Sequence, residues 1–282
     1  MSYRRLKAVC LLFWIFLPIS CATVRKAPAI RFPYLWLDKQ GFGGDIDRVG
    51  FPEPSGICFH PKRKTLFVVS DEGELMEMGL DGSPMFRQKI AGDLEGITCH
   101  PETGLLYIIV EGDDVILEYD RDLMDVKRKF PLNRAYGGDP EFLQKQVDAY
   151  DNGIEDIAFV PRKDHPEGGT FYICNQWDPP CIMDVLVPLR SSPDPVHEAY
   201  ILKVLPFRID DPAAMYYDNN RRILNVVSDA DNILVELTLH GRLVNEYAFL
   251  GDNQEGIAVD DEGYLYIAQD TGGILKVKDL RR

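Results

Sequence analysis

An internal repeat constrains the fold more than any other feature of this chain. The stretch DLEGITCHPETGLLYIIVEGDD (residues 93–114) has the same plan as NQEGIAVDDEGYLYIAQDTGG (residues 253–273). In each, Glu-Gly-Ile opens a short apolar run, a turn follows, and a second apolar run ends near another acid. Similarity that recurs at a period of about 20–50 residues is typical of solenoids and propellers. The repeat therefore narrows the fold class before any single element is assigned.

Five segments of the chain share this plan. Their equivalent second positions are Ser55, Glu95, Glu155, Ala213 and Glu255. These positions are separated by 40, 60, 58 and 42 residues. Two of the spacings are close to the length of a propeller blade, and the other two contain visible insertions.

Most of the five segments have the residue pattern of four short strands. Runs such as TLFVVS, LLYIIV and YLYIAQ are rich in β-branched and aromatic residues and are bounded by turn residues. Four strands make one blade. The last segment has only about three such patterns before Arg282, and the run Ala29–Asp38 can supply the fourth.

We therefore expect an all-β protein, a five-bladed β-propeller closed by this N-terminal strand. A six-bladed ring would need a further blade inside an insertion, and neither insertion contains four strand patterns. The connection Gly137–Tyr150 differs from the rest of the chain. Asp139 is a candidate N-cap and Pro140 would stand at the first helical position, so this segment predicts a short helix.

Propeller geometry explains why each repeat carries acids at its two ends. The first strand of a blade starts on one face of the disc, and the second strand returns to that face. We expect Glu95, Glu155 and Glu255 to converge there, while Glu53 and Asp211 open the other two segments slightly earlier. The ends of the second strands add Asp71, Glu111, Asn175, Asp229 and Asp270.

Several carboxylates crowded near one axis repel one another unless some are protonated or a cation lies among them. Ca²⁺ fits such a site best, because it accepts six to eight oxygen ligands in flexible geometry. Softer metals are disfavoured, since no Cys or His falls at these positions. The alternative is that each acid caps nearby backbone N–H groups and is satisfied locally. This alternative is strongest for Glu53 and Asp211, which precede Pro.

Other chemistries find less support in the sequence. There is no G-x-S-x-G stretch, and His60 and His100 fall in turns on the face opposite the acids. The formal net charge of −14 would repel a nucleic acid backbone, so nucleic acid is excluded as a partner. We expect a monomer whose partner is a small-molecule or protein ligand.

The N-terminus has the pattern of a secretion signal. Basic residues precede the uncharged apolar run Ala8–Ser20, which is shorter than the roughly 20 residues of a membrane span. LPISCA then resembles a lipoprotein signal with Cys21 as the lipidated residue; ordinary cleavage near Cys21 is the alternative. We expect a signal over residues 1–21, a linker over 22–28, and one domain over 29–282. The protein would then lie in the bacterial cell envelope, lipid-anchored or periplasmic.

Four cysteines remain after the signal and Cys21. Cys174 and Cys181 flank NQWDPP, a tight connection between two strand patterns, and a local disulfide there is compatible with an oxidising compartment. Cys58 and Cys99 have the pattern of buried strand residues.

The motifs DLEGIT, GIEDIAF, NQEGIAVD and VVSD, behind a secretion signal, resemble the SdiA-regulated (YjiK-like) bacterial proteins. The resemblance covers nearly everything from Ala29 onwards and implies an NHL-repeat-related, five-bladed propeller with a calcium site. It supplies no established biochemical activity. The acidic positions that match are Glu95, Glu155, Glu255, Glu111 and Asp270, whereas Asn175 replaces an acid.

Two hypotheses about function follow. The first is a calcium-binding protein that recognises a ligand or partner on its acidic face. The alternative is a calcium-dependent hydrolase of lactones or phosphoesters, in which the metal polarises the substrate and Asp229 or Asp270 acts as base. The absence of a His on the expected metal face counts against a paraoxonase-like mechanism.

Overall fold

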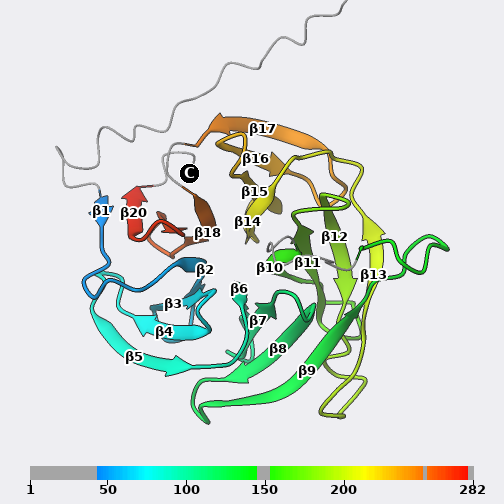
Figure 1. The fold of residues 1–282 in the computed structure, drawn as a ribbon, viewed down its shortest axis with the longest axis horizontal. Helices are drawn as coiled ribbons and strands as arrows, with labels where there is room; N and C mark the ends of the chain where they lie inside the picture. Colours follow the sequence, from blue (N-terminus) through cyan, green and yellow to red (C-terminus); the bar gives the residue numbers. More distant parts are fainter. Residues whose placement is uncertain (1–42, 145–152, 250–252, 279–282) are drawn as a thin grey trace, which may run out of the picture.

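The computed structural model describes residues 43–144, 153–249 and 253–278, and every regular element in these ranges is a β-strand. The strands form a ring around a central axis (Figure 1). They fall into antiparallel groups of four, in which each strand pairs with the next along the chain, except that β1 joins the last group by pairing with β20. This is a β-propeller, so the predicted all-β class is confirmed. No helix among the described residues could cross a membrane.

Three of the groups are separate four-stranded sheets, and two of these consist of strands that are consecutive in the chain. The first contains β2 (Pro54–His60), β3 (Thr65–Ser70), β4 (Glu74–Met78) and β5 (Pro84–Lys89). The other contains β14 (Pro212–Asp218), β15 (Ile223–Ser228), β16 (Ile233–Leu237) and β17 (Leu243–Ala248).

Two further groups are joined into one eight-stranded sheet. One consists of β6 (Leu94–Cys99), β7 (Leu106–Val110), β8 (Val115–Asp120) and β9 (Asp125–Asn133). The other consists of β10 (Ile154–Pro161), β11 (Gly169–Asn175), β12 (Cys181–Leu186) and β13 (Ala199–Val204). They meet at their outer strands, where β13 pairs in parallel with β9 through Ala199↔Leu132 and Tyr200↔Asn133.

The last group takes strands from both ends of the described chain. It contains β18 (Gln254–Val259), β19 (Tyr264–Gln269), β20 (Ile274–Lys278) and β1 (Gly43–Asp45). The strand β1 runs antiparallel along the outer edge of β20, with Gly43 opposite Val277 (Figure 1). The edge of β20 is thus covered by an N-terminal strand, as expected, but the predicted strand Ala29–Asp38 lies outside the described residues.

The predicted helix is wrong over the part of it that the structure describes. Residues 137–144 form turns, and the backbones of Tyr136 and Asp139 pair through two hydrogen bonds of 2.9 and 3.0 Å. Gly137 and Gly138 adopt positive φ values of 63° and 92° in the turn that precedes Asp139, and residues 140–143 continue as turns and bends. The remainder of the predicted helix, residues 145–150, lies outside the described ranges.

The core consists of layers between neighbouring groups. In β3, all six residues are buried, and they alternate between the two sides of the sheet. Phe67 and Val69 pack in a cluster with Ile108 of β7, while Val68 packs in another with Tyr266 of β19. A strand that is buried on both faces needs a continuous apolar run, which explains why the second strands read TLFVVS or LLYIIV.

Glycines let the innermost strands come close to one another near the axis. A Cβ added at Gly56 would lie 2.1 Å from the carbonyl oxygen of Glu95, and one at Gly96 would lie 2.5 Å from Cα of Asp156. A Cβ at Gly256 would lie 2.8 Å from the backbone nitrogen of Ile57. The Gly that precedes Ile in these three inner strands therefore permits the backbone of one inner strand to touch the next.

Four buried acids in the third strands have a structural role that the repeat analysis missed. Each forms an ion pair with an arginine, in which a guanidinium nitrogen lies 2.5 to 2.7 Å from a carboxylate oxygen. The pairs are Glu77–Arg63, Glu118–Arg128, Asp184–Arg162 and Glu236–Arg221. These carboxylates are neutralised by arginine and belong to no metal site.

The predicted disulfide between Cys174 and Cys181 is not formed, and both thiols are free and buried. The residue opposite Cys181 is Asn175, so Cys174 is one position out of register with it. Because side chains alternate across a strand, the two thiols point to opposite faces of the sheet and pack in different clusters. Cys58 and Cys99 are buried strand residues, as expected.

Candidate metal centre

Strand pairing brings the acids at the two ends of each repeat together. The residue that precedes an inner strand is bonded to the residue that follows the second strand. Glu111 N donates to Asp93 O at 3.0 Å, Asp270 N to Asn253 O at 3.0 Å, and Asp229 N to Asp211 O at 3.2 Å. These acids therefore lie on one face of the ring for the reason that the repeat suggested.

All five inner strands have an irregular register near their start, at the repeat position that carries an acid in three of them. In β6 the pairing with β7 shifts between Leu94 and Ile97, and the same shift occurs near the start of β2, β10, β14 and β18. A bulge of this kind redirects a side chain away from the regular alternation. Glu95 occupies this irregular position, as do Glu155 and Glu255 in their own strands.

The backbone just before the inner strands is unusual as well. Glu53, Asp211 and Asn253 occupy equivalent positions before β2, β14 and β18, and their φ angles are 41°, 50° and 50°. Positive φ is uncommon for residues other than glycine, and such residues cluster at functional sites. Their side chains are thereby placed beside the acids at the ends of the second strands.

Two groups of three carboxylates result. Asp93, Glu95 and Glu111 each offer an oxygen, and these oxygens lie within 4.8 Å of one another. Glu53, Asp71 and Asp270 form a second such group, which joins the first four-stranded sheet to the last one. Two oxygens that bind one Ca²⁺ at 2.3–2.6 Å lie at most about 5 Å apart, so both groups fit the size of that ion.

Glu155 extends the first group across to the next inner strand. Its carboxyl group is hydrogen-bonded to that of Glu111. Burial and the neighbouring charges of Glu95, Glu111 and Glu255 raise the pKa of Glu155 well above its usual range. The pKa of Glu95 is raised in the same way, by burial and by Asp93 and Glu111. Two residues from different inner strands thus interact with the same Glu111.

The Glu255 carboxyl group interacts electrostatically with acids of both groups. Burial raises its pKa to about 8, with further contributions from Asp229, Asp270, Asp211 and Glu111. Asp71 has a pKa raised to about 7, first by burial and then by Glu53. Without a cation, the charge of this face is therefore reduced by protonation.

We call the end of the ring where these carboxylates gather the acidic mouth. Seven of the eight predicted ligands lie there, and one lies apart. The seven are Glu95, Glu155, Glu255, Glu111, Asp270, Asp71 and Asp229. The exception is Asn175, whose amide donates to the carbonyl oxygens of Trp177 and Pro179, at 3.0 Å for the latter. Its side chain holds the loop that follows β11.

The sequence analysis did not name two residues at the acidic mouth. One is a further ligand candidate, and the other supports the site. Asp93 completes the first group, and its signal is the acid that precedes Leu-Glu-Gly in the repeat. Asp156 lies behind Glu155, and its buried carboxylate accepts bonds from Ile157 N at 2.7 Å and Met215 N at 2.5 Å. It ties β10 to β14 beneath the acids. Nothing in one sequence distinguishes such a support from a ligand.

The ring of antiparallel four-stranded groups and the carboxylates at one mouth define a β-propeller with an acidic central site. The sequence model of the SdiA-regulated family matches residues 51–271, and the chain belongs to this family.

The fold is similar to that of a solved glutaminyl cyclase. A glutaminyl cyclase from Myxococcus xanthus superposes with a TM-score of 0.56 at 10% identity, over 83% of this chain and 94% of that one. The Cps50 (Swd1) β-propeller domain from Myceliophteria thermophila gives a TM-score of 0.45 at 10% identity, over 80% of this chain and 64% of that one. At this identity the similarity to the cyclase concerns the fold alone.

Proposed function

We propose that this protein is an exported, calcium-binding, five-bladed propeller that recognises a ligand at its acidic mouth. The observation that carries the proposal is the group formed by Asp93, Glu95 and Glu111, with Glu155 hydrogen-bonded to it from the next inner strand. Three carboxylate oxygens within 4.8 Å of one another have a strong electrostatic reason to bind a cation.

Calcium suits this donor set better than other metals. The donors are carboxylates, with no Cys or His in either three-residue group, and such hard oxygen ligands disfavour soft metals. Mg²⁺ needs near-ideal octahedral geometry, whereas Ca²⁺ tolerates the unequal reach of Asp and Glu from several strands. Asp93, Glu95, Glu111 and Glu155 would hold the ion, and a bound ion would leave positions for ligand oxygens.

The antiparallel groups among the described strands support a count of five blades, with the eight-stranded sheet taken as two blades and β1 with β18–β20 taken as the fifth. The parallel contact of β13 with β9 then joins two neighbouring blades at the rim. This arrangement supports a closed ring in which a site at the axis receives ligands from several blades. An incomplete ring would not form the site.

The N-terminal sequence supports export and attachment to a membrane through a lipid on Cys21. In that case the propeller would face the cell envelope, with membrane contact supplied by the lipid and a small-molecule or protein ligand at the acidic mouth. Calcium is available to such a protein without competing cytosolic regulation. The signal and Cys21 lie outside the described residues.

Metal analysis and melting curves test the proposal. The purified protein is measured for bound calcium, and its melting temperature is recorded with calcium, magnesium and zinc after treatment with chelator. Calcium should raise the melting temperature most, because a ligand bound only by the folded state stabilises it. A melting curve that is indifferent to both calcium and chelator would contradict the proposal.

A second function, calcium-dependent hydrolysis of lactones or phosphoesters, is favoured by one observation. Asp229 and Asp270 both influence Glu255, so carboxylates lie beside the proposed ion where a general base could act. A panel of lactones and phosphoesters assayed with and without chelator separates the two functions. Chelator-sensitive turnover that Asp229→Asn or Asp270→Asn abolishes would favour hydrolysis over recognition.

A further inference from the structure

Asp156 departs from the repeat at the third position of the inner strands. The equivalent residues in the other four inner strands are small and have no polar side chain; they are Gly56, Gly96, Ala214 and Gly256. Asp156 is only 2% exposed. A carboxylate at so buried a position needs hydrogen-bond donors, and those donors show what the side chain does.

The Asp156 carboxylate accepts backbone hydrogen bonds from three inner strands. Its Oδ2 accepts a bond from Met215 N of β14 at 2.5 Å, and its Oδ1 accepts one from Ile157 N of its own strand, β10, at 2.7 Å. The backbone N–H of Ile97 in β6 also donates to it. Gly96 leaves room for the group, because a Cβ there would lie 2.5 Å from Asp156 Oδ1. One side chain thus joins β6, β10 and β14.

Two of these donors stand at the bulges that carry candidate ligands. The pairing of β6 with β7 shifts just before Ile97, and the pairing of β10 with β11 shifts just before Ile157. A bulge leaves a residue out of the regular ladder. Glu95 and Glu155 lie inside these bulges, each two residues before an N–H that donates to Asp156. The bonds to Asp156 therefore fix the two bulges relative to each other, and with them the spacing of the two carboxylates.

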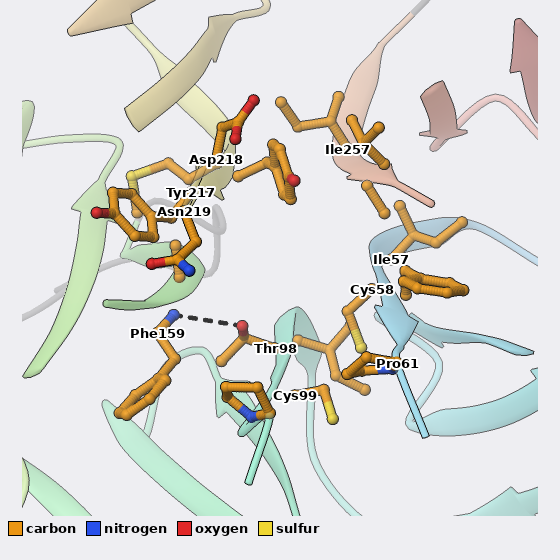
Figure 2. A pocket seen from close by; sticks show the side chains of 18 of the residues that line it. Ile57, Cys58, Pro61, Thr98, Cys99, Phe159, Tyr217, Asp218, Asn219 and Ile257 are labelled. Atoms are coloured by element: carbon orange, nitrogen blue, oxygen red, sulfur yellow. Dashed lines mark hydrogen bonds between the residues drawn. The ribbon is translucent and has the colours of Figure 1, made fainter. Parts of the chain in front are cut away.

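The axis is open at the end of the inner strands away from the acids. A cavity of about 390 Å³ is lined there by all five inner strands, and its lining includes Ile97 and Ile157. Figure 2 shows a hydrogen bond beside this cavity, from Phe159 N of β10 to Thr98 Oγ1 of β6, at 3.3 Å. Because no packed side chains fill the axis at this end, backbone contacts and the bonds to Asp156 hold the spacing of the strands beside the acids.

We propose that Asp156 is a positioning residue that makes the acidic mouth selective for calcium over magnesium. This inference rests on the proposed function, since it concerns the same cation. Mg²⁺ draws its oxygen ligands in to about 2.0–2.1 Å, against about 2.3–2.6 Å for Ca²⁺. Strands that are tied together by a buried carboxylate resist the movement of Glu95 and Glu155 toward a smaller ion. Asp156 itself is not a ligand, because both of its oxygens are bonded to backbone N–H groups.

Calorimetric titrations of calcium and of magnesium into the chelator-treated protein test this inference. Asp156→Gly introduces the residue that three other inner strands have at this position. Calcium binding should weaken about 10–100-fold in this variant, the range for residues that orient metal ligands. Magnesium binding should weaken less, so the preference for calcium should fall severalfold. The ratio of the two Kd values separates position from charge, because the loss of one negative charge weakens both divalent ions alike.

A second variant and a second measurement support the titrations. Asp156→Asn keeps the size of the side chain but has one accepting oxygen in place of two, so it should lose part of the preference even if Asp156→Gly does not fold. Hydrogen exchange of the chelated protein, followed by mass spectrometry, needs no metal. Peptides that contain Ile97 and Met215 should exchange faster in both variants than in the parent.

Val235→Ala is the control for a loss of stability alone, because it changes a buried residue of β16. It should keep the parent's preference for calcium. A ratio that neither Asp156 variant changes, an equal weakening of both ions, or unchanged exchange would overturn the role of Asp156 and leave the calcium proposal standing. A parent protein that binds neither ion would overturn both.

Discussion

The backbone N–H of Glu111 donates to the carbonyl oxygen of Asp93 at 3.0 Å, and the side chains of the two residues belong to the same group of three carboxylates. The bond that aligns two strands therefore also sets the spacing of two candidate ligands. A change in the pairing of β6 with β7 would move both the sheet and the site. This coupling makes the metal proposal testable through stability.

Removing two of the acids should remove the effect of calcium. At a hundredfold excess over Kd, a ligand of the folded state contributes about 2.7 kcal/mol, which for a domain of this size corresponds to a rise in melting temperature of roughly 5–10 °C. Glu95→Gln with Glu155→Gln should abolish that rise in a thermal melt. The double variant should also melt at or above the metal-free parent, because it relieves repulsion near the axis.

The control for this pair is Glu246→Gln, which changes an acid on the outer strand β17. It should retain the full response to calcium. A double variant that still gains the parent's increment would show that the cation binds elsewhere.

Stability without metal should fall as pH rises. Glu255 has a folded-state pKa of about 8 against an ordinary value of 4.5, so between these values the folded state binds more protons than the unfolded chain. The free energy of unfolding therefore decreases with pH across that window. Chemical denaturation of the chelated protein at pH 5, 6, 7 and 8 measures this slope. Glu255→Gln should flatten it, and a rising slope in the parent would contradict the pKa shift.

Protons and calcium should compete for the same carboxylates. The stabilisation by calcium should therefore grow between about pH 5 and pH 8, as Glu255 and its neighbours lose protons. Titrations of calcium by calorimetry at several pH values check this. An affinity that does not change across the range would exclude these acids as ligands.

Gly96→Ala should be poorly tolerated. Its Cβ would lie 2.5 Å from Cα of Asp156, a backbone atom that cannot move without shifting β10. We expect a loss of about 3 kcal/mol in the free energy of unfolding, the upper range for overpacking, together with weaker calcium binding. Gly44→Ala is the control, since nothing lies within 4 Å of its Cβ, and it should unfold as the parent does.

Two truncations distinguish the strands that could cover β20. A chain that begins at Phe42 keeps β1 but lacks the predicted strand Ala29–Asp38, and it should stay monomeric in size-exclusion chromatography. A chain that begins at Asp47 lacks both, exposes the edge of β20, and should aggregate or melt at a lower temperature. If the two truncations behave alike, β1 does not protect the edge.

Cys21→Ser should release the protein from membranes in its bacterial host while leaving it outside the cytoplasm. Cell fractionation followed by immunoblotting measures this. Cys10→Ser, within the apolar run of the signal, is the matched control and should fractionate as the parent does. Membrane association that survives Cys21→Ser would exclude the lipid anchor.

The repeat was enough to predict the class of fold and the face on which the acids gather. The repeat shows where successive strands begin and end, and it shows that the second strand returns to the face where the first one starts. Both are local properties of the chain. The bulge that orients Glu95 was not predictable, because an irregular register is a relationship between two strands. Asp156 is similar: its role depends on a bond to Met215, 59 residues away.

Two predictions that the structure contradicts, the helix over Gly137–Tyr150 and the disulfide between Cys174 and Cys181, failed for local physical reasons. An Asp-Pro pair at positions 139 and 140 satisfies the rules for a helix start, but the backbone of Asp139 pairs with that of Tyr136 across a turn made by two glycines. The spacing of Cys174 and Cys181 suits a hairpin, but the pairing register decides whether two side chains share a face. That register places Asn175 opposite Cys181.

The pairing of β1 with β20 also bears on when folding can finish. Gly43 meets Val277 across nearly the whole length of the chain, so this contact has one of the largest sequence separations in the molecule. It can form only after the last strand has left the ribosome, and loop closure over such a distance is slow. Until then the groups can form singly, but no cavity or acidic mouth exists at the axis. Such a chain remains open throughout its synthesis and completes its ring in a single late step.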